Sequence, residues 1–335
     1  MNERGGLDGH PVEVVIADDG GDAARHQALV QELVEQRGAI ALVGNGEALT
    51  GPGSVDYLTQ RGIPVVGSEG AAQYFYESPV YFPQHSHGDA LLQAGALANA
   101  TAARERGQTR IGVIGCIEVQ VCQDSVDKAD ALYAKYGLQV VYTSSASFFE
   151  ASYTAQCLNA QRAGVELLSL AMDPGSVSRI AADCALQGFR PTIAFGNTII
   201  VADHADDPNL DGAALFSPMA PWFSDATPGQ AEFLDAMARF APDVEPNPGH
   251  FQGWVAGKVL VLAAGALGEP ATSQQLLDGL SSINGDPLAD ITSPLLFNRG
   301  APATPTVCAW TATIADGEFA TTGGGRLCTE FDPNL

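Results

Sequence analysis

The stretch "AIALVGNGEALTG" at Ala39–Gly51 is an apolar run that ends in Gly-Asn-Gly at 44–46 and leads into a helix-like segment. A strand that delivers the chain to a helix N-terminus presents free amides and the positive end of the helix dipole, which can hold a carboxylate or a phosphate. A nucleotide site does not fit. The third glycine of a dinucleotide fingerprint falls at Gly51 instead of position 49, no Walker lysine follows, and Glu47 would face the pyrophosphate. Two interpretations remain open, a carboxylate site and a tight turn that only needs glycine.

The same order of strand and helix repeats along the chain. Short apolar runs predict strands at 12–17, 39–44, 63–67, 110–115, 138–142, 167–172 and 192–196. Between and after them, the patterns predict helices at 22–36, 51–60, 88–105, 123–136, 152–163, 175–187 and 273–281. Continuous apolar strands separated by helices are typical of parallel sheets covered on both faces. The last residues alternate like a hairpin around Asp316-Gly317.

Two series of strands and helices predict two doubly wound lobes, as does the length of 335 residues. The first series ends near 84–87, and a second break lies at 241–249, where prolines and a glycine interrupt two helical segments. We therefore expect lobe I at 1–87 and 247–303, and lobe II at 88–246 and 304–335. Crossings between the lobes would form a multi-segment hinge, and a cleft between hinged lobes is the expected ligand site.

Composition excludes several classes of protein. Apolar residues make up 46% of the chain, and 16 Lys and Arg against 39 Asp and Glu give a net charge of −23. This acidic balance disfavours binding to nucleic acid or anionic membranes. The most apolar stretch, Trp254–Gly268, is too short to span a membrane and is interrupted by Lys258. We expect it to be a helix buried between the lobes.

Six cysteines pair by position in the simplest scheme: Cys116 with Cys122, Cys157 with Cys184, and Cys308 with Cys328. Fifteen pairings are possible in principle. None of the cysteines has CxxC spacing, so a zinc or thioredoxin-like site is not expected. Three disulfides would indicate an oxidising compartment, whereas the alternative is buried free thiols in a cytosolic protein.

The chain resembles the type I periplasmic solute-binding proteins of the leucine/isoleucine/valine-binding group, which serve ABC transporters. Residues 2–44, from "NERGGLDGHPVEVVIADD" to "AIALVG", carry the first part of the resemblance. The later parts are "GIPVVG" (62–67), "YFPQ" (81–84), "RIGVIG" (110–115) and "GHFQGWVAGKVLVLAAGAL" (249–267). The resemblance covers nearly the whole chain. It implies two α/β lobes, three crossing segments and closure around a small molecule without chemistry.

The resemblance also implies where a ligand is held. The loop at 48–50 would offer helix N-terminal amides and a hydroxyl to a ligand carboxylate, and the loop at 67–71 would add donors. The second lobe would contribute residues that follow its strands. The residues expected at the ligand are Ala48, Leu49, Thr50, Glu69, Gly70, Ala71, Tyr74, Asp173, Asn197, Trp222 and His250.

This chain departs from the amino-acid binders of the family at several of these positions. Ala48 replaces their serine, which leaves Thr50 as the nearby hydroxyl, and Ala71 replaces their threonine. Glu69 takes a position that is usually small, and Asp173 takes the place of an aromatic residue. The two carboxylates disfavour an anionic ligand and could hold an ammonium, amide or hydroxyl group. An ordinary branched-chain amino acid is therefore not the expected ligand.

Each of these residues also has an interpretation without a ligand. Glu69 could be a solvated loop charge, and Asp173 could cap a helix that begins at Pro174. Trp222 or Phe223, near a tyrosine position of the family, could pack internally or form an aromatic wall of the site. His250 could face the ligand or simply supply polarity at a helix start.

Metal and catalytic signals are weak or absent in the sequence. His85 and His87 lack the further ligands that zinc requires, so we expect no metal and no cofactor. The sequence has no GxSxG, HExxH or Walker lysine, so we expect no enzyme. Catalytic triads can assemble from distant residues, which leaves an enzyme on a doubly wound fold as one alternative.

The expected function is the extracytoplasmic solute-binding component of an ABC importer, with a small polar or amphipathic ligand and a membrane permease as partners. We expect a monomer. The main alternative is a ligand-sensing domain of a receptor or regulator. The first residues, "MNERGG", look like the last turn of a helix. Because a strand and helix precede this position in the family, we expect the natural product to begin about 50 residues upstream. We expect it to start with a signal peptide, which could be of the lipoprotein type.

Overall fold

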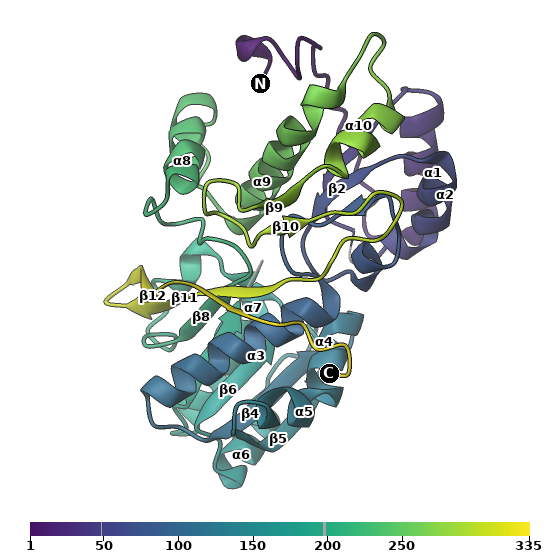
Figure 1. Ribbon diagram of the computed structural model, residues 1–335. Coiled ribbons are helices and arrows are strands. Elements are labelled where there is room, and N and C mark those ends of the chain that lie inside the picture. Colours follow the sequence, from purple (N-terminus) through teal and green to yellow (C-terminus); the bar gives the residue numbers. More distant parts are fainter. Residues whose placement is uncertain (48, 197–198) are drawn as a thin grey trace. The chain divides into compact units, whose positions relative to one another are not determined.

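The alternation of apolar strands and helices produces parallel sheets in both parts of the chain, so the predicted α/β class is confirmed. The computed structural model describes residues 1–47, 49–196 and 199–335 (Figure 1). The chain divides into two compact units. Unit 1 comprises Met1–Gly88 and Gly249–Thr306, and unit 2 comprises Asp89–Pro248 and Val307–Leu335.

Unit 2 contains a seven-stranded sheet with the strand order β12-β11-β8-β7-β6-β4-β5. The five strands from β8 to β5 in this order are parallel, whereas β11 is antiparallel to both β8 and β12. The strands span Arg110–Cys116 (β4), Gln139–Ala146 (β5), Leu167–Ala171 (β6), Thr192–Gly196 (β7), Ala214–Ser217 (β8), Val307–Ala315 (β11) and Glu318–Thr329 (β12).

Helices cover both faces of this sheet. Successive strand residues point to opposite sides, so neighbouring residues of one strand pack against different helices. Ile111 and Val113 of β4 pack with residues of α3 (Gly88–Glu105) and α5 (Ala129–Ala134). Ile114, the next residue, packs instead with residues of α6 (Thr154–Ala163) and α7 (Pro174–Leu186). In the same way, Leu167 of β6 belongs to the group that packs with α3 and α5, and Leu168 belongs to the group that packs with α6 and α7. Burial on both faces is the reason that β4 and β6 are apolar at most positions.

The three predicted cysteine pairs are disulfides, and all three lie in unit 2. Cys116–Cys122 joins the end of β4 to α4 (Gln120–Asp127), and Cys157–Cys184 joins α6 to α7. Cys308–Cys328 links β11 to β12, whose turn has Asp316 and Gly317 at φ 54° and 81°, as a two-residue hairpin requires. The described residues include no free cysteine.

Unit 1 contains a three-stranded parallel sheet in the order β1-β2-β3. Its core includes Val30, Leu58, Val65 and Phe75, all buried. The elements are β1 (Leu42–Asn45), β2 (Val65–Ser68), β3 (Tyr81–Phe82), α1 (Ala23–Glu35) and α2 (Val55–Arg61). A separate antiparallel pair is formed by β9 (Asn284–Asp286) and β10 (Leu295–Leu296).

Helix α9 (Pro248–Ala263) packs closely against β2 in unit 1. A Cβ on Gly67 would lie 2.5 Å from Ala256 Cβ, and Gly67 has φ 73°, so only glycine fits this crossing. The apolar stretch Trp254–Gly268 forms most of α9 and the short η6 (Ala264–Ala266), as a helix prediction requires. Its far end is not buried as expected, since Val261 and Leu262 are 46% and 42% exposed.

The predicted strand at 12–17 is wrong. Residues 12–17 pair with none of the described strands, and Val14 and Ile16 are 77% and 90% exposed. The alternating letters "VEVVIA" suit a sheet, but a strand forms only where a neighbouring strand satisfies its N–H and C=O groups. A local pattern cannot supply that neighbour.

Substituting Ile16→Lys should therefore change the free energy of unfolding by less than about 0.5 kcal/mol and reduce aggregation, because an exposed apolar side chain is replaced by a charge. Leu58→Ala, in the core of the same unit, should cost about 2–5 kcal/mol. Urea unfolding and light scattering measure the two effects. A loss above about 1 kcal/mol for Ile16→Lys would mean that this segment is packed in solution.

Two predicted helices have different boundaries from those expected. The segment 51–60 begins as η2 (Gly51–Ser54) before α2, and 123–136 divides at Lys128 into α4 and α5. The remaining elements are η1 (Asn2–Arg4), η3 (Gln73–Tyr76), η5 (Ala202–His204), α8 (Pro228–Phe240) and α10 (Ser273–Leu280). Within the described ranges, every helix is too short or too polar to cross a membrane.

Candidate functional site

Two loops begin side by side at the carboxyl edge of the unit 1 sheet. Asn45 at the end of β1 pairs with Ser68 at the end of β2, so the loops that start at Gly46 and Glu69 are neighbours. Ligands of open α/β sheets bind at this edge. In the first loop Thr50 is buried and Leu49 is 58% exposed, while Ala48 lies outside the described residues.

Carboxylates of the chain accept hydrogen bonds from three donors in or next to these loops. The Glu47 N–H donates to Glu69 Oε2 at 3.1 Å, and the Ser68 hydroxyl donates to the same oxygen at 2.7 Å. The Thr50 hydroxyl donates to Asp19 Oδ2 at 2.7 Å. Thr50 was expected to face a ligand carboxylate, but its proton is directed at a carboxylate of the chain itself.

His26 lies between two of the carboxylates. Its position on α1, one turn before Val30, puts it on the buried face of the helix, whose N-terminus is capped by the Asp22 side chain. His26 Nδ1 is 2.9 Å from Asp19 Oδ2, and Nε2 is 3.4 Å from Glu47 Oε2. The hydrogen bond from Thr50 is the main reason that the pKa of Asp19 is lowered. Asp19 and His26 were not predicted, because neither lies in the glycine loops.

Glu47 belongs to the same cluster as Asp19, His26 and Glu69, and its pKa is strongly raised. Its side chain is 2% exposed. Burial, followed by the charge of Glu69, raises the pKa of Glu47 to about 8. Burial also raises the pKa of Glu69. A carboxyl in this position is therefore neutral at pH 7 unless a cation approaches it.

Two tyrosines complete the cluster. The Tyr74 hydroxyl donates to the Glu47 carbonyl oxygen at 3.5 Å, and the Tyr74 and Tyr81 rings meet edge to face at 5.4 Å. Burial is the first cause of the raised pKa of both tyrosines, and the charge of Glu47 is the second. A Cβ on Gly51 would lie 2.1 Å from the Tyr74 hydroxyl, so this loop needs glycine for packing. Tyr74 was expected at the site, whereas Tyr81 was not.

The second loop continues from Glu69 into Gly70 and Ala71. Gly70 has φ 95°, and its carbonyl oxygen accepts from the Gly88 N–H at 2.9 Å. Ala71 is partly exposed. These two residues therefore turn the chain toward η3, and the titratable groups of the loop are Glu69 and Tyr74.

The residues predicted in unit 2 follow the strands β6, β7 and β8. Asp173 caps α7 by accepting from the Gly175 N–H at 3.0 Å, which is the alternative that needs no ligand. Trp222 is buried and packs against Phe223 and Phe319, with ring centroids 5.4 and 5.9 Å away. Asn197 lies outside the described residues.

The predicted histidines are placed in unit 1. His250 is the third residue of α9 and is partly exposed. His85 and His87 are buried and stacked with centroids 4.8 Å apart, and their Nδ1 atoms lie 2.7 and 2.8 Å from backbone carbonyl oxygens. Burial lowers the pKa of His85 to about 4 and also lowers the pKa of His87 well below its ordinary value. Among the described residues, no three His, Cys, Asp or Glu side chains are arranged to hold a metal ion.

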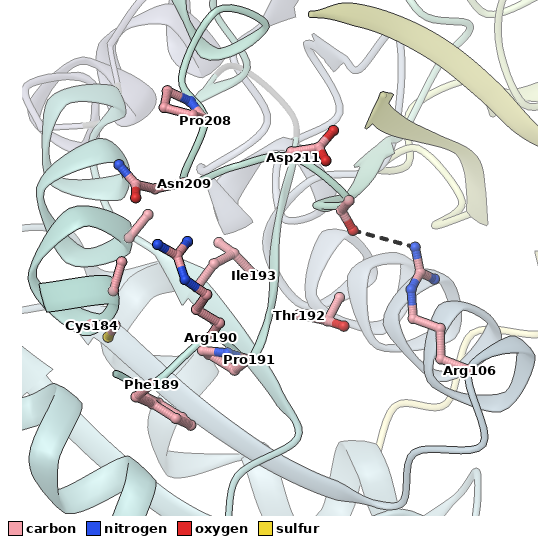
Figure 2. A pocket seen from close by; sticks show the side chains of 13 residues that line it. Arg106, Cys184, Phe189, Arg190, Pro191, Thr192, Ile193, Pro208, Asn209 and Asp211 are labelled. Atoms are coloured by element: carbon pink, nitrogen blue, oxygen red, sulfur yellow. Dashed lines mark hydrogen bonds between the residues drawn. The ribbon is translucent and has the colours of Figure 1, made fainter. Parts of the chain in front are cut away.

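A cavity of about 450 Å³ lies in unit 2, and its lining includes none of the residues predicted to contact the ligand (Figure 2). Arg106, at its rim, donates from Nη2 to the Gly212 carbonyl oxygen at 3.4 Å. Thr192 begins β7 and Gly212 precedes β8, so the cavity lies at the amino ends of these strands. Because α/β sheets bind ligands at the opposite edge, we assign it no role in binding.

Comparison with known families gives one match over nearly the whole chain. The family model described as periplasmic binding protein matches residues 1–318. A comparison with curated proteins gives no match.

Solved structures of the same fold are numerous but distant in sequence. A solute-binding protein of R. palustris in complex with benzoate has 16% identity and a TM-score of 0.78, over 98% of this chain and 90% of that one. A leucine-binding protein of Thermotoga maritima has 12% identity and a TM-score of 0.79, over 96% and 90%. A fatty acid transporter substrate-binding protein of Thermomonospora curvata has 15% identity and a TM-score of 0.79, over 98% and 85%. These similarities show the fold.

Proposed function

Because the chain belongs to the periplasmic binding protein family, we propose that it is the solute-binding component of an ABC importer. The observation that carries the proposal is the family match over residues 1–318. The three disulfides of unit 2 support an extracytoplasmic location, where such bonds persist. The partners would be a small molecule and a membrane permease, with the protein acting as a monomer.

The ligand would be a small polar or amphipathic molecule, amino-acid-like, an amide or a related compound. The similar structures include proteins named for benzoate, leucine and fatty acid, so the fold accommodates different ligands. In unit 1 the candidate residues are those at the carboxyl ends of β1 and β2, where α/β folds bind ligands. His250 of α9 is a further candidate in unit 1, and the candidates in unit 2 are Asp173, Asn197 and Trp222.

Hinge closure would be the mechanism. The chain passes between the units three times, at 88–89, 248–249 and 306–307. We propose that the ligand contacts both units and so favours a closed state, which the permease would recognise. A ligand shifts such an equilibrium only by its difference in affinity for the two states.

A thermal-shift screen against amino acids, amides, polyols and aromatic acids tests ligand binding. A ligand at about 100 times its Kd should stabilise the protein by about 2.7 kcal/mol. Small-angle scattering should then show that the ligand reduces the radius of gyration of the protein. Nuclear magnetic resonance of the released ligand should show that its chemical structure is unchanged. Conversion of the ligand would instead indicate an enzyme.

Uptake of the labelled ligand by cells with and without the gene tests the transport role. Deletion should abolish high-affinity uptake. Normal uptake by the deletion strain, with binding intact in the purified protein, would contradict transport and favour sensing.

A further inference from the structure

In the loops expected to hold an anion, carboxylates of the chain itself already accept hydrogen bonds from donors that a ligand carboxylate would need. The Glu47 N–H is bound to Glu69 Oε2 at 3.1 Å, and the Thr50 hydroxyl is bound to Asp19 Oδ2 at 2.7 Å. A ligand carboxylate at this edge would meet three carboxyl groups and would have to displace internal hydrogen bonds. The ionised groups among them, Asp19 first, repel an anion at such short range.

One carboxyl oxygen of the cluster, Glu47 Oε1, receives no hydrogen bond from the described residues. Glu47 is 2% exposed. The Tyr81 hydroxyl, on a side chain 1% exposed, is likewise unpartnered among these residues, and it lies within electrostatic range of Glu47. A buried polar group without a partner is costly, so an incoming group that donates to Glu47 Oε1 would remove that cost.

We propose, on the premise of the solute-binding function, that the protein selects ligands with a cationic head group and that Glu47 and Glu69 hold this group. An ammonium, amidinium or guanidinium group supplies several donors and a positive charge, which matches two neighbouring carboxylates. The aromatic rings of Tyr74 and Tyr81 belong to the same cluster, and cation–π attraction to such rings would also favour a cation there.

Binding of a cation should be coupled to loss of a proton from Glu47. The groups that face Glu47 are Asp19 before α1, His26 on α1, Glu69 after β2, Tyr74 on η3 and Tyr81 on β3. Since the pKa of Glu47 is raised to about 8, the carboxyl must ionise to pair with the cation. Affinity for an amine should therefore rise by up to about tenfold for each pH unit between about pH 6 and pH 8.

Matched probes that differ in the charge of one group test this proposal by calorimetry and thermal shift. The pairs are benzylamine with benzoate and hexylamine with hexanoate. We expect the amines to bind in preference to the carboxylates, and Glu47→Gln to weaken amine binding by about 10- to 100-fold. Glu35→Gln is the matched control, because this carboxylate of unit 1 lies in an exposed ion pair with Arg61. It should leave binding unchanged.

The double variant Glu47→Gln/Glu69→Gln separates a role in recognition from a role in folding. It removes both charges, while the amide oxygen introduced at position 69 can still accept from the N–H at position 47, so the preference for amines should be lost. Wild-type binding of the carboxylates, or of uncharged amides and polyols alone, would overturn the cationic class and leave the solute-binding function intact. Failure of every charged and uncharged compound to bind would count against both.

Discussion

Glu47→Gln is expected to stabilise the folded protein at about pH 9 by on the order of 3–5 kcal/mol and to have little effect at about pH 5. Burial and the charge of Glu69 raise the pKa of Glu47 from 4.5 to about 8 in the folded state. The folded state thus holds the proton more tightly than the unfolded state does. The stability from this group is complete below about pH 4.5 and is lost as the pH rises to about 8. Glutamine resembles the neutral carboxyl and does not ionise.

Other buried groups affect the free energy of unfolding in a different pH range. The pKa of His85 is lowered to about 4 and that of His87 is lowered well below its ordinary value, because both imidazoles are buried. Their contribution is complete above the unfolded pKa of about 6.5 and is lost as the pH falls. Wild-type stability should therefore fall on both sides of about pH 6.5, and the substitution should remove most of the fall on the alkaline side.

Urea unfolding of the wild type and the variant at several pH values measures this difference. Glu35→Gln provides the control, since the Glu35 side chain is 48% exposed and its pKa is lowered by Arg61 and Tyr57. It should keep the wild-type slope above about pH 6.5. If Glu47→Gln also keeps that slope, the carboxyl is ionised and solvated in the folded protein at neutral pH, contrary to the structure.

Removing Cys157–Cys184 by the double substitution to serine is expected to destabilise unit 2 by about 3.5 kcal/mol, from the entropy of the chain segment that the bond closes. The two cysteines are 27 residues apart and join α6 to α7, and both are buried in the core beneath these helices. Loss of the bond lets the unfolded chain explore more conformations. It also places two hydroxyls in an apolar cluster, which adds to the cost.

Cys116–Cys122 provides a matched comparison because it lies in the same unit and closes a shorter segment, with a separation of 6 residues. Its replacement by serine should cost about 2.2 kcal/mol by the same relation. Calorimetry can follow both variants, with the transition of unit 1 as an internal reference because unit 1 contains none of these disulfides. A larger loss for Cys116–Cys122 than for Cys157–Cys184 would contradict the loop-length explanation.

Most of the fold was predictable because its signals are local. Continuous apolar runs marked β4, β6 and β7, whose side chains are buried on both faces. The Asp316-Gly317 pair marked the β11–β12 hairpin, because its backbone conformation depends on those two residues. The cysteine pairs followed from their nearness in sequence and from the elements that carry them. The same local signals failed at 12–17, where pairing depends on a neighbouring strand.

The sequence by itself determined most of the order of strands and helices, the disulfide pairing and the two glycine loops that follow β1 and β2, since each depends on residues that are near in sequence. The tertiary structure alone decided what those loops present. Asp19, His26, Glu47, Glu69 and Tyr81 come from separate segments, and only the folded sheet brings them within reach of one another. Burial and mutual charge, which no local pattern encodes, make Glu47 neutral and leave Thr50 bound to Asp19.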